Sequence, residues 1–197
     1  MEFLRGRFCS GLRGASLSCS GCNCYDAATN RRNFIIAHSG LVAGIALADI
    51  PKVQLLDDAL RWLDGLDKAA SVKSATAWKM GAVFEHLAQS IDMSLDGFPD
   101  PKSTLFQNTV GAVAFAVFKW RGKMGHGLTD PIPGAPALAQ SDDWKPGAQT
   151  LRNAIARFNS HTGPVKPHFA YGSLSHSDFA LAHALHIANH QDGILVG

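Results

Sequence analysis

Apolar residues recur along this chain with the spacing of helices, and no segment convincingly predicts a strand. In the first helical segment, Val53, Leu56, Leu60 and Leu63 recur at steps of three and four residues and so share one helix face. We therefore expect five helices, which cover residues 53–68, 76–95, 100–122, 146–160 and 175–193.

Residues that typically begin or end helices set the expected boundaries. Ser74 or Thr76 is expected to cap the start of the second helix, and Gly97 to end it. Ser175 and Asp178 form the pattern of a capping box, in which side-chain oxygens satisfy the free N–H groups of the first helical turn. The last helix is therefore expected to begin at Ser175.

The third helical segment and the connection after it differ from the rest. Residues 110–118 form an apolar run that is too short to span a bilayer, which favours a helix buried in the core. Residues 125–145 are rich in proline and glycine, and we expect either a crossover or a flap over a site. The predicted fold class is all-α: an antiparallel four-helix bundle with an additional short helix and a long Pro/Gly-rich crossover.

The N-terminal part of the chain predicts an export signal. Arg31 and Arg32 precede a mostly apolar stretch, residues 34–48, which is shorter than the roughly 20 residues of a membrane span. Ala46 and Ala48 supply the small-x-small pattern that signal peptidase accepts. The arginine pair and its neighbours resemble a twin-arginine leader, which predicts a periplasmic or secreted protein. The alternative is an arm that stays attached.

Charge and cysteine content divide at the same point. All four cysteines lie within residues 1–30, where a zinc-binding cluster, a leader extension and a start codon assigned too early are the alternatives. Residues 1–48 carry five arginines and two acidic side chains, whereas the other residues carry 13 basic and 14 acidic ones. Nothing in that remainder predicts nucleic-acid binding. We expect a leader with a twin-arginine-type signal over residues 1–48 and a helical-bundle domain over residues 49–197, with no stable membrane span in the mature form.

Two histidines on the last expected helix are the strongest functional signal. His186 and His190 are four residues apart, so their imidazoles project from one helix face about one turn apart. A third histidine, His86, lies in the second expected helix on a face that its apolar neighbours turn inward. Three imidazoles with an open fourth position are typical of a catalytic zinc site, and neutral imidazole also binds Ni, Cu and Fe.

Nearby polar residues are candidates to orient these rings. His183 points between the directions of His186 and His190, one turn earlier, and Asn189 and Gln89 carry amides that could hydrogen-bond to an imidazole. Glu85 points about 100° away from its neighbour His86 and is a poor fourth ligand. The alternative is that the histidines are core residues bonded to backbone carbonyls, or partly exposed.

Other aromatic and histidine residues have less specific roles. Residues 168–173 are expected to form either the lip of a substrate site or a well-packed turn, and the surrounding glycines and prolines favour the turn. We expect His126, His161 and His176 in loops or at helix ends, in contact with solvent. Trp78, Trp120 and Trp144 are expected in the core or at an interface.

Several segments of the chain resemble a known protein family. They are residues 85–91 with 97–99, 161–164, 167–175 and 183–190. Together they resemble the DinB/YfiT-like superfamily of metalloenzymes, and within it an uncharacterised family, a domain of unknown function, whose members often carry twin-arginine leaders. The resemblance covers about residues 50–193. It implies a DinB-like bundle in which His86, His186 and His190 are the metal ligands.

The resemblance leaves the reaction open. Characterised members of the superfamily include transferases and isomerases that use low-molecular-weight thiols in the cytoplasm, and an exported protein would not meet such thiols. We expect an exported protein that binds a divalent metal (Zn, Ni or Fe) and a small-molecule substrate, as a metal-dependent transferase or hydrolase. The alternatives are a non-catalytic binding protein of the cell envelope and a structural bundle with core histidines. A homodimer is compatible with each of them.

Overall fold

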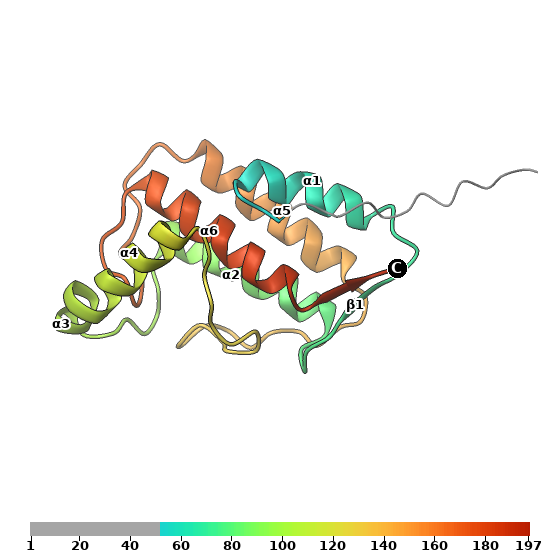
Figure 1. The fold of residues 1–197 in the computed structure, drawn as a ribbon, viewed down its shortest axis with the longest axis horizontal. Helices are drawn as coiled ribbons and strands as arrows, with labels where there is room; N and C mark the ends of the chain where they lie inside the picture. Colours follow the sequence, from blue (N-terminus) through green and yellow to red (C-terminus); the bar gives the residue numbers. More distant parts are fainter. Residues whose placement is uncertain (1–51) are drawn as a thin grey trace, which may run out of the picture. The chain divides into compact units, whose positions relative to one another are not determined.

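A computed structural model describes residues 52–197, all of which belong to one compact unit (Figure 1). Within this range five helices pack against one another, and two short strands form a minor sheet. The helices are α1 (Leu56–Leu66), α2 (Met80–Asp96), α4 (Ala112–Arg121), α5 (Lys145–Ser160) and α6 (His176–Gln191), and the strands are β1 (Val72–Ser74) and β2 (Ile194–Val196). The expected signal residues Arg31, Arg32, Ala46 and Ala48 lie outside the described residues.

The hydrophobic core lies between α2 and α5, and α1 and α6 complete it (Figure 1). Phe84 of α2 is fully buried and meets Trp62 of α1 and Trp144, each with 5.7 Å between ring centroids. Phe158 of α5 and Phe179 of α6 are also fully buried. The apolar faces predicted for α1, α2, α5 and α6 therefore form the core.

Side-chain hydrogen bonds set the helix ends. The Ser175 Oγ accepts a hydrogen bond from the Asp178 N–H at 3.1 Å, which confirms Ser175 as the cap of α6. The expected start of α2 near Thr76 was wrong. The Ser74 Oγ accepts from the Thr76 N–H at 3.1 Å, and the Thr76 Oγ1 accepts from the Trp78 N–H at 3.3 Å. These hydroxyls stabilise successive turns, so α2 begins only at Met80.

The expected third helix is present, but it is neither regular nor buried. It starts with a short turn, α3 (Thr104–Phe106), passes through a π-helical segment at Gln107–Gly111, and continues as α4. Phe115 packs on Tyr171 with 5.5 Å between ring centroids, whereas Trp120 is 85% exposed. The expectation of a buried core helix was therefore wrong. Both sides of α4 are apolar, and the sequence does not reveal that only one of them is covered.

The two strands are a further departure from the all-α prediction. β1 and β2 pair antiparallel with Val72 opposite Val196 and Ser74 opposite Ile194. Three residues per strand are too few to produce the alternating pattern by which strands are recognised in a sequence. The pairing ends α6 at Gln191 and ties the chain after it to the connection between α1 and α2.

Residues 122–144 join α4 to α5 and lie along α2. The Ala139 N–H donates to the Glu85 carboxylate at 2.8 Å, and the Gly81 N–H donates to the Ser141 carbonyl at 2.9 Å. The side chain of Gln89 donates to the Pro136 carbonyl at 3.3 Å. The connection is thus a crossover held against α2. Among the described residues, no helix combines the length and the apolar character needed to traverse a lipid bilayer.

Candidate metal centre

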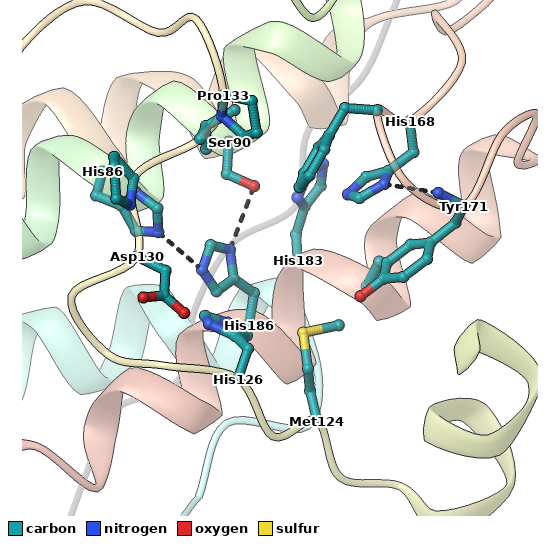
Figure 2. A pocket seen from close by; sticks show the side chains of 14 residues that line it. His86, Ser90, Met124, His126, Asp130, Pro133, His168, Tyr171, His183 and His186 are labelled. Carbon is teal, nitrogen blue, oxygen red and sulfur yellow. Dashed lines mark hydrogen bonds between the residues drawn. The ribbon is translucent and has the colours of Figure 1, made fainter. Parts of the chain in front are cut away.

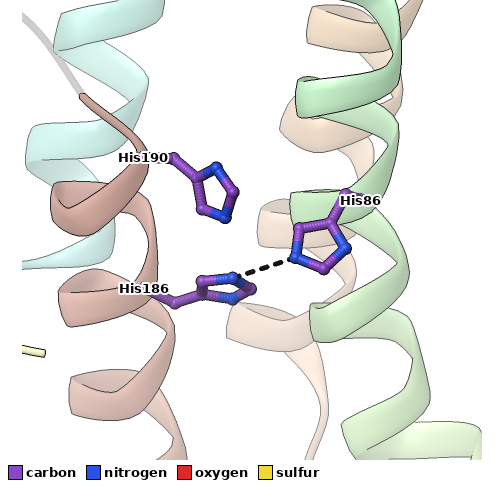
Figure 3. A group of neighbouring side chains, drawn as sticks. All are labelled: His86, His186 and His190. Atoms are coloured by element: carbon purple, nitrogen blue, oxygen red, sulfur yellow. Dashed lines mark hydrogen bonds between the residues drawn. The ribbon is translucent and has the colours of Figure 1, made fainter. Parts of the chain in front are cut away.

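Three histidines meet between α2 and α6. His86 comes from α2, and His186 and His190 come from α6 (Figure 3). One nitrogen from each ring lies within 4.8 Å of the other two, and the Nε2 atoms of His86 and His186 are 3.1 Å apart. The four-residue spacing puts two rings on one face of α6, and α2 packs against that face. The structure therefore brings together the three residues predicted as ligands.

Burial keeps these imidazoles neutral. Loss of contact with water, followed by the proximity of His126, lowers the pKa of His86 to about 4. Loss of water, followed by the proximity of His86, lowers the pKa of His190 to about 3. The same causes hold the pKa of His186 well below its ordinary value. A neutral imidazole has a free lone pair, so at neutral pH the cluster can bind a cation without first losing protons.

The hydrogen bonds of the cluster fit a metal ion. His190 Nε2 is buried and has no hydrogen-bond partner within residues 52–197, and a buried polar atom without a partner costs about 1–3 kcal/mol of folding free energy. His86 Nδ1 also lacks a partner there, but it lies on the side of the ring away from the Nε2 that faces His186 (Figure 3). Two nitrogens bound to one tetrahedral zinc ion lie roughly 3.3 Å apart, close to the 3.1 Å between the Nε2 atoms of His86 and His186. Three imidazole donors, two of them at this spacing and the third within 4.8 Å, therefore suit a divalent transition metal.

Ser90 orients one ring of the cluster, and the sequence analysis missed it. Its Oγ lies 3.2 Å from His186 Nδ1, which turns the other nitrogen of that ring toward His86 (Figure 2). Ser90 follows His86 by four residues on α2 and so shares its helix face, and that spacing was the available signal. A hydroxyl on the far nitrogen of a ligand imidazole fixes its tautomer and its direction.

The residues predicted to orient the rings have other partners in the part of the chain that is described. His183 Nε2 lies 3.2 Å from the Ser94 Oγ, one turn away from the cluster. Asn189 donates to the carbonyl of His126 at 3.2 Å, and the Gln89 amide holds the crossover. Asn189 therefore positions the loop that carries His126.

His126 lies in a loop and is partly exposed, as expected, and the loop also brings it beside the histidine cluster. Its ring is partly buried and lies beside the cluster, with 4.7 Å between its centroid and that of His186. Its Nδ1 lies 2.9 Å from the Gly127 carbonyl, which can only accept, so Nδ1 donates to it. Asp130 of the same loop partly opposes the lowered pKa of His86. No periodicity places a loop residue, so the sequence held no signal for either one.

A cavity of about 310 Å³ adjoins the cluster (Figure 2). His86 and His186 form one wall, and the crossover covers it with Met124, His126 and residues 130–133. The far wall contains His168, Phe169, Tyr171 and His183. Residues 168–173 include the expected tight turn, in which His168 and Gly172 exchange backbone hydrogen bonds, and side chains of this turn line the cavity. The volume suits a small molecule.

Comparison with known proteins gives one match. A family model described as a protein of unknown function (DUF1569) matches residues 51–195, which include every residue of the cluster and of the cavity. No curated protein and no solved structure matches the chain.

Proposed function

The chain belongs to the DUF1569 family of proteins of unknown function, and we propose that it binds a divalent transition metal at His86, His186 and His190. The observation that carries the proposal is the convergence of three neutral imidazoles, with the buried Nε2 of His190 lacking a partner within residues 52–197, beside a cavity that His86 and His186 line. Zn, Ni and Fe all suit such ligands. The cavity makes a small-molecule transferase or hydrolase the function that the site supports best.

A metal with three protein ligands keeps a position open and can polarise a substrate carbonyl or activate water. The chain's own residues have separate roles. Ser90 holds the ring of His186, and His126 lies beside the cluster with its Nδ1 held by the Gly127 carbonyl. The crossover covers the cavity with Met124 and Ile132, both buried, and so limits the access of water.

We also propose that the chain belongs to the DinB/YfiT-like superfamily and has its four-helix bundle fold. The resemblance of residues 85–91 and 183–190 to the DinB/YfiT-like superfamily supports the same three ligands. A core shared by α1, α2, α5 and α6 supports a DinB-like four-helix bundle, to which the crossover and the α3–α4 segment are additions.

We also propose export to the periplasm or outside the cell through the twin-arginine route. The support is the motif at Arg31 and Arg32 and the small residues Ala46 and Ala48. Replacing both arginines by lysine should leave the uncleaved protein in the cytoplasm, whereas the parent should be exported with a new N-terminus at Asp49. A location that is unchanged by the replacement would contradict export by this route.

Metal content tests the proposed function directly. The full chain, with its four cysteines changed to serine to remove competing thiolates, is loaded in turn with Zn, Ni and Fe, desalted and measured by elemental analysis. We expect about one ion per chain, lost in His86→Ala, His186→Ala and His190→Ala. His161→Ala is the matched control, because its ring hydrogen-bonds to Pro164 and lies outside the cluster. A parent that retains none of the three metals would contradict the proposal, as would metal retained by all three cluster variants.

A non-catalytic binding protein is the second candidate, with the same ligands and the same metal content. It is distinguished by the cavity, because a protein that only stores the ion has no need for a small molecule to reach it. A structural bundle with core histidines is the third candidate, and it predicts no metal in the loading experiment.

A further inference from the structure

The end of the cavity away from the cluster contains polar groups to which the proposed metal chemistry gives no role. They are His168, Tyr171 and His183, and they lie near one another beside the cavity (Figure 2). His168 is 8% exposed and His183 is 2% exposed. Buried polar groups are normally hydrogen-bonded, so groups that keep free donors or acceptors at a cavity wall indicate a ligand.

Backbone contacts determine where the proton of His168 lies. Its Nδ1 is 3.1 Å from the backbone nitrogen of Ala170 and 3.2 Å from that of Tyr171 (Figure 2). Both backbone groups are donors, so Nδ1 accepts and the neutral ring carries its proton on Nε2. Nε2 has no hydrogen-bond partner among the described residues, and the ring directs it away from the turn toward the cavity. His168 therefore presents an N–H donor.

A different contact determines the tautomer of His183. The Ser94 hydroxyl donates its only proton to the Ile91 carbonyl at 2.6 Å, so toward His183 it can only accept. His183 Nε2, 3.2 Å from that oxygen, therefore carries the proton. The other nitrogen, Nδ1, is left with a lone pair and without a partner in residues 52–197. His183 thus offers an acceptor where His168 offers a donor.

Tyr171 adds a hydroxyl to the same end of the cavity. Its ring stacks on His168 with 4.2 Å between centroids and an angle of 6° between the ring planes, which fixes both side chains. Burial raises the pKa of Tyr171 to about 12, so its hydroxyl stays protonated. The stack leaves the hydroxyl within the cavity (Figure 2).

The charge of this end of the cavity is zero. Loss of water lowers the pKa of both His168 and His183 to about 3, so both rings are neutral at physiological pH. Among the residues that line the described cavity there is no lysine or arginine. The one carboxylate, Asp130, comes from the loop that carries His126. A charged group bound at the His168 end would lose its hydration without gaining a counter-charge.

We propose that His168, Tyr171 and His183 bind a neutral amide-type group. Its carbonyl accepts from His168 Nε2–H and the Tyr171 hydroxyl, and its N–H donates to His183 Nδ1. Met124, Ile132 and Phe169 contact the apolar body of the ligand. This proposal rests on the proposed function in one respect. It takes the bound molecule to be the substrate, a small neutral amide whose reacting part reaches the histidine cluster.

Three probes of nearly equal shape test the charge requirement. Benzamide, benzoate and benzamidine carry charges of 0, −1 and +1 at pH 7.5, and their binding to the full chain is measured by protein-detected NMR in EDTA. We expect benzamide to bind and the two charged probes to bind at least about tenfold more weakly. Equal binding of the three, tighter binding of a charged probe, or no binding of benzamide would overturn the proposal.

Two variants test whether benzamide binds at Tyr171 and His183. Tyr171→Phe removes the hydroxyl, and His183→Phe removes Nδ1 together with the Nε2–H that bonds the Ser94 hydroxyl. Both keep a ring, and each should weaken benzamide binding at least about threefold. His161→Phe is the matched control and should leave the affinity unchanged. An unchanged affinity in both cavity variants would overturn the assignment. Because the experiment needs no metal, its outcome is independent of metal binding. Benzamide binding without metal binding would support this site and contradict the proposed function. Metal binding without benzamide binding would support the proposed function and contradict this site.

A second inference concerns the exposed side of residues 104–121. Residues 103–118 carry no charged side chain. Val110, Val113, Val117 and Trp120 are 59%, 64%, 40% and 85% exposed, while Phe115 on the opposite side is buried. Steps of three and four residues between them are the spacing of a seam between paired helices.

We infer that this face pairs with a second copy of the chain. With Leu105 and Phe106, the exposed side chains offer on the order of 600 Å², near the roughly 800 Å² per partner of a standard interface. In a twofold antiparallel pair about Val113, Trp120 of one copy meets Leu105 and Phe106 of the other, so the face is self-complementary. A helix that lies on a membrane needs a charged opposite side, whereas here that side packs on the protein.

The molar mass of the full chain in solution tests this pairing by sedimentation velocity. We expect a dimer that Val113→Glu combined with Val117→Glu converts to a monomer. Leu195→Glu, at a 58% exposed residue of β2, is the control and should remain a dimer. A monomeric parent or a dimeric double variant would overturn the inference, and co-sedimentation of a monomeric parent with anionic vesicles would identify a membrane as the occupant instead.

Discussion

His190→Leu should stabilise the metal-free protein and destabilise the metal-loaded one relative to the parent. His190 is 2% exposed, and its Nε2 has no partner among the described residues. An unpartnered buried polar atom costs about 1–3 kcal/mol, and leucine fills nearly the same volume without it. The free energy of unfolding in EDTA should therefore rise by about 1–3 kcal/mol, and the melting temperature by a few degrees.

Bound metal should reverse the order of stability, so that the parent becomes more stable than His190→Leu. A ligand at 1,000 times its dissociation constant stabilises the folded state by about 4 kcal/mol, and the variant, with two ligands left, should lose most of that gain. Urea denaturation followed by circular dichroism, in EDTA and in excess zinc, gives the four free energies of unfolding. His161→Leu is the control and should show no reversal. If His190→Leu were less stable than the parent in EDTA, the claim that Nε2 lacks a partner would be refuted.

Three further predictions concern pH, packing and surface ion pairs. The pKa values of His86, His168, His183 and His190 are lowered from 6.5 to about 4 or 3, and that of His186 also lies well below 6.5. Below pH 6.5 the unfolded chain therefore binds more protons than the folded protein. The free energy of unfolding should be constant with respect to these histidines above pH 6.5 and should fall as the pH is lowered, by up to about 1.4 kcal/mol per pH unit for each histidine. Urea denaturation in EDTA between pH 5 and 7.5 measures this slope, and a flat profile would contradict it. Gly111→Ala would place a Cβ 1.8 Å from the Ala170 carbonyl oxygen and should cost about 1–3 kcal/mol while weakening benzamide, whereas Gly65→Ala, with nothing within 4 Å, should do neither. Arg157→Ala removes ion pairs from α5 to Asp92 and Asp96 of α2 at 2.8 and 2.6 Å, but because these groups are exposed the loss should stay below about 1.5 kcal/mol and shrink in 1 M salt.

The site divides into a part that local sequence determines and a part that it does not. The spacing of His186 and His190 places both rings on one face of α6 wherever that helix packs. The inward face of α2 made His86 a candidate, and its position opposite the pair was implied by a resemblance rather than by periodicity. His126 and Asp130 lie on the crossover, whose course depends on hydrogen bonds to α2 such as that of the Ala139 N–H to Glu85. Such tertiary contacts leave no periodic pattern.

The same division holds for the fold. The apolar stripes of α1, α2 and α5 correspond to buried faces, because a single covered face produces a clear period. The α4 segment is apolar on both sides, so its sequence resembles that of a core helix although Trp120 is exposed. β1 and β2 pair with each other across more than a hundred residues of chain, and neither is long enough to be recognised alone.

The spacing of the three histidines also has a consequence for the order of folding. His186 and His190 are one turn apart, whereas His86 is 100 residues from His186. An ion that bridges the pair would offset the unfavourable nucleation of α6 while the rest of the chain is still disordered. His86 could join only after a 100-residue loop has closed, which costs chain entropy. Metal would thus be captured in two stages, with helix nucleation first and closure of the site as one of the last steps of folding.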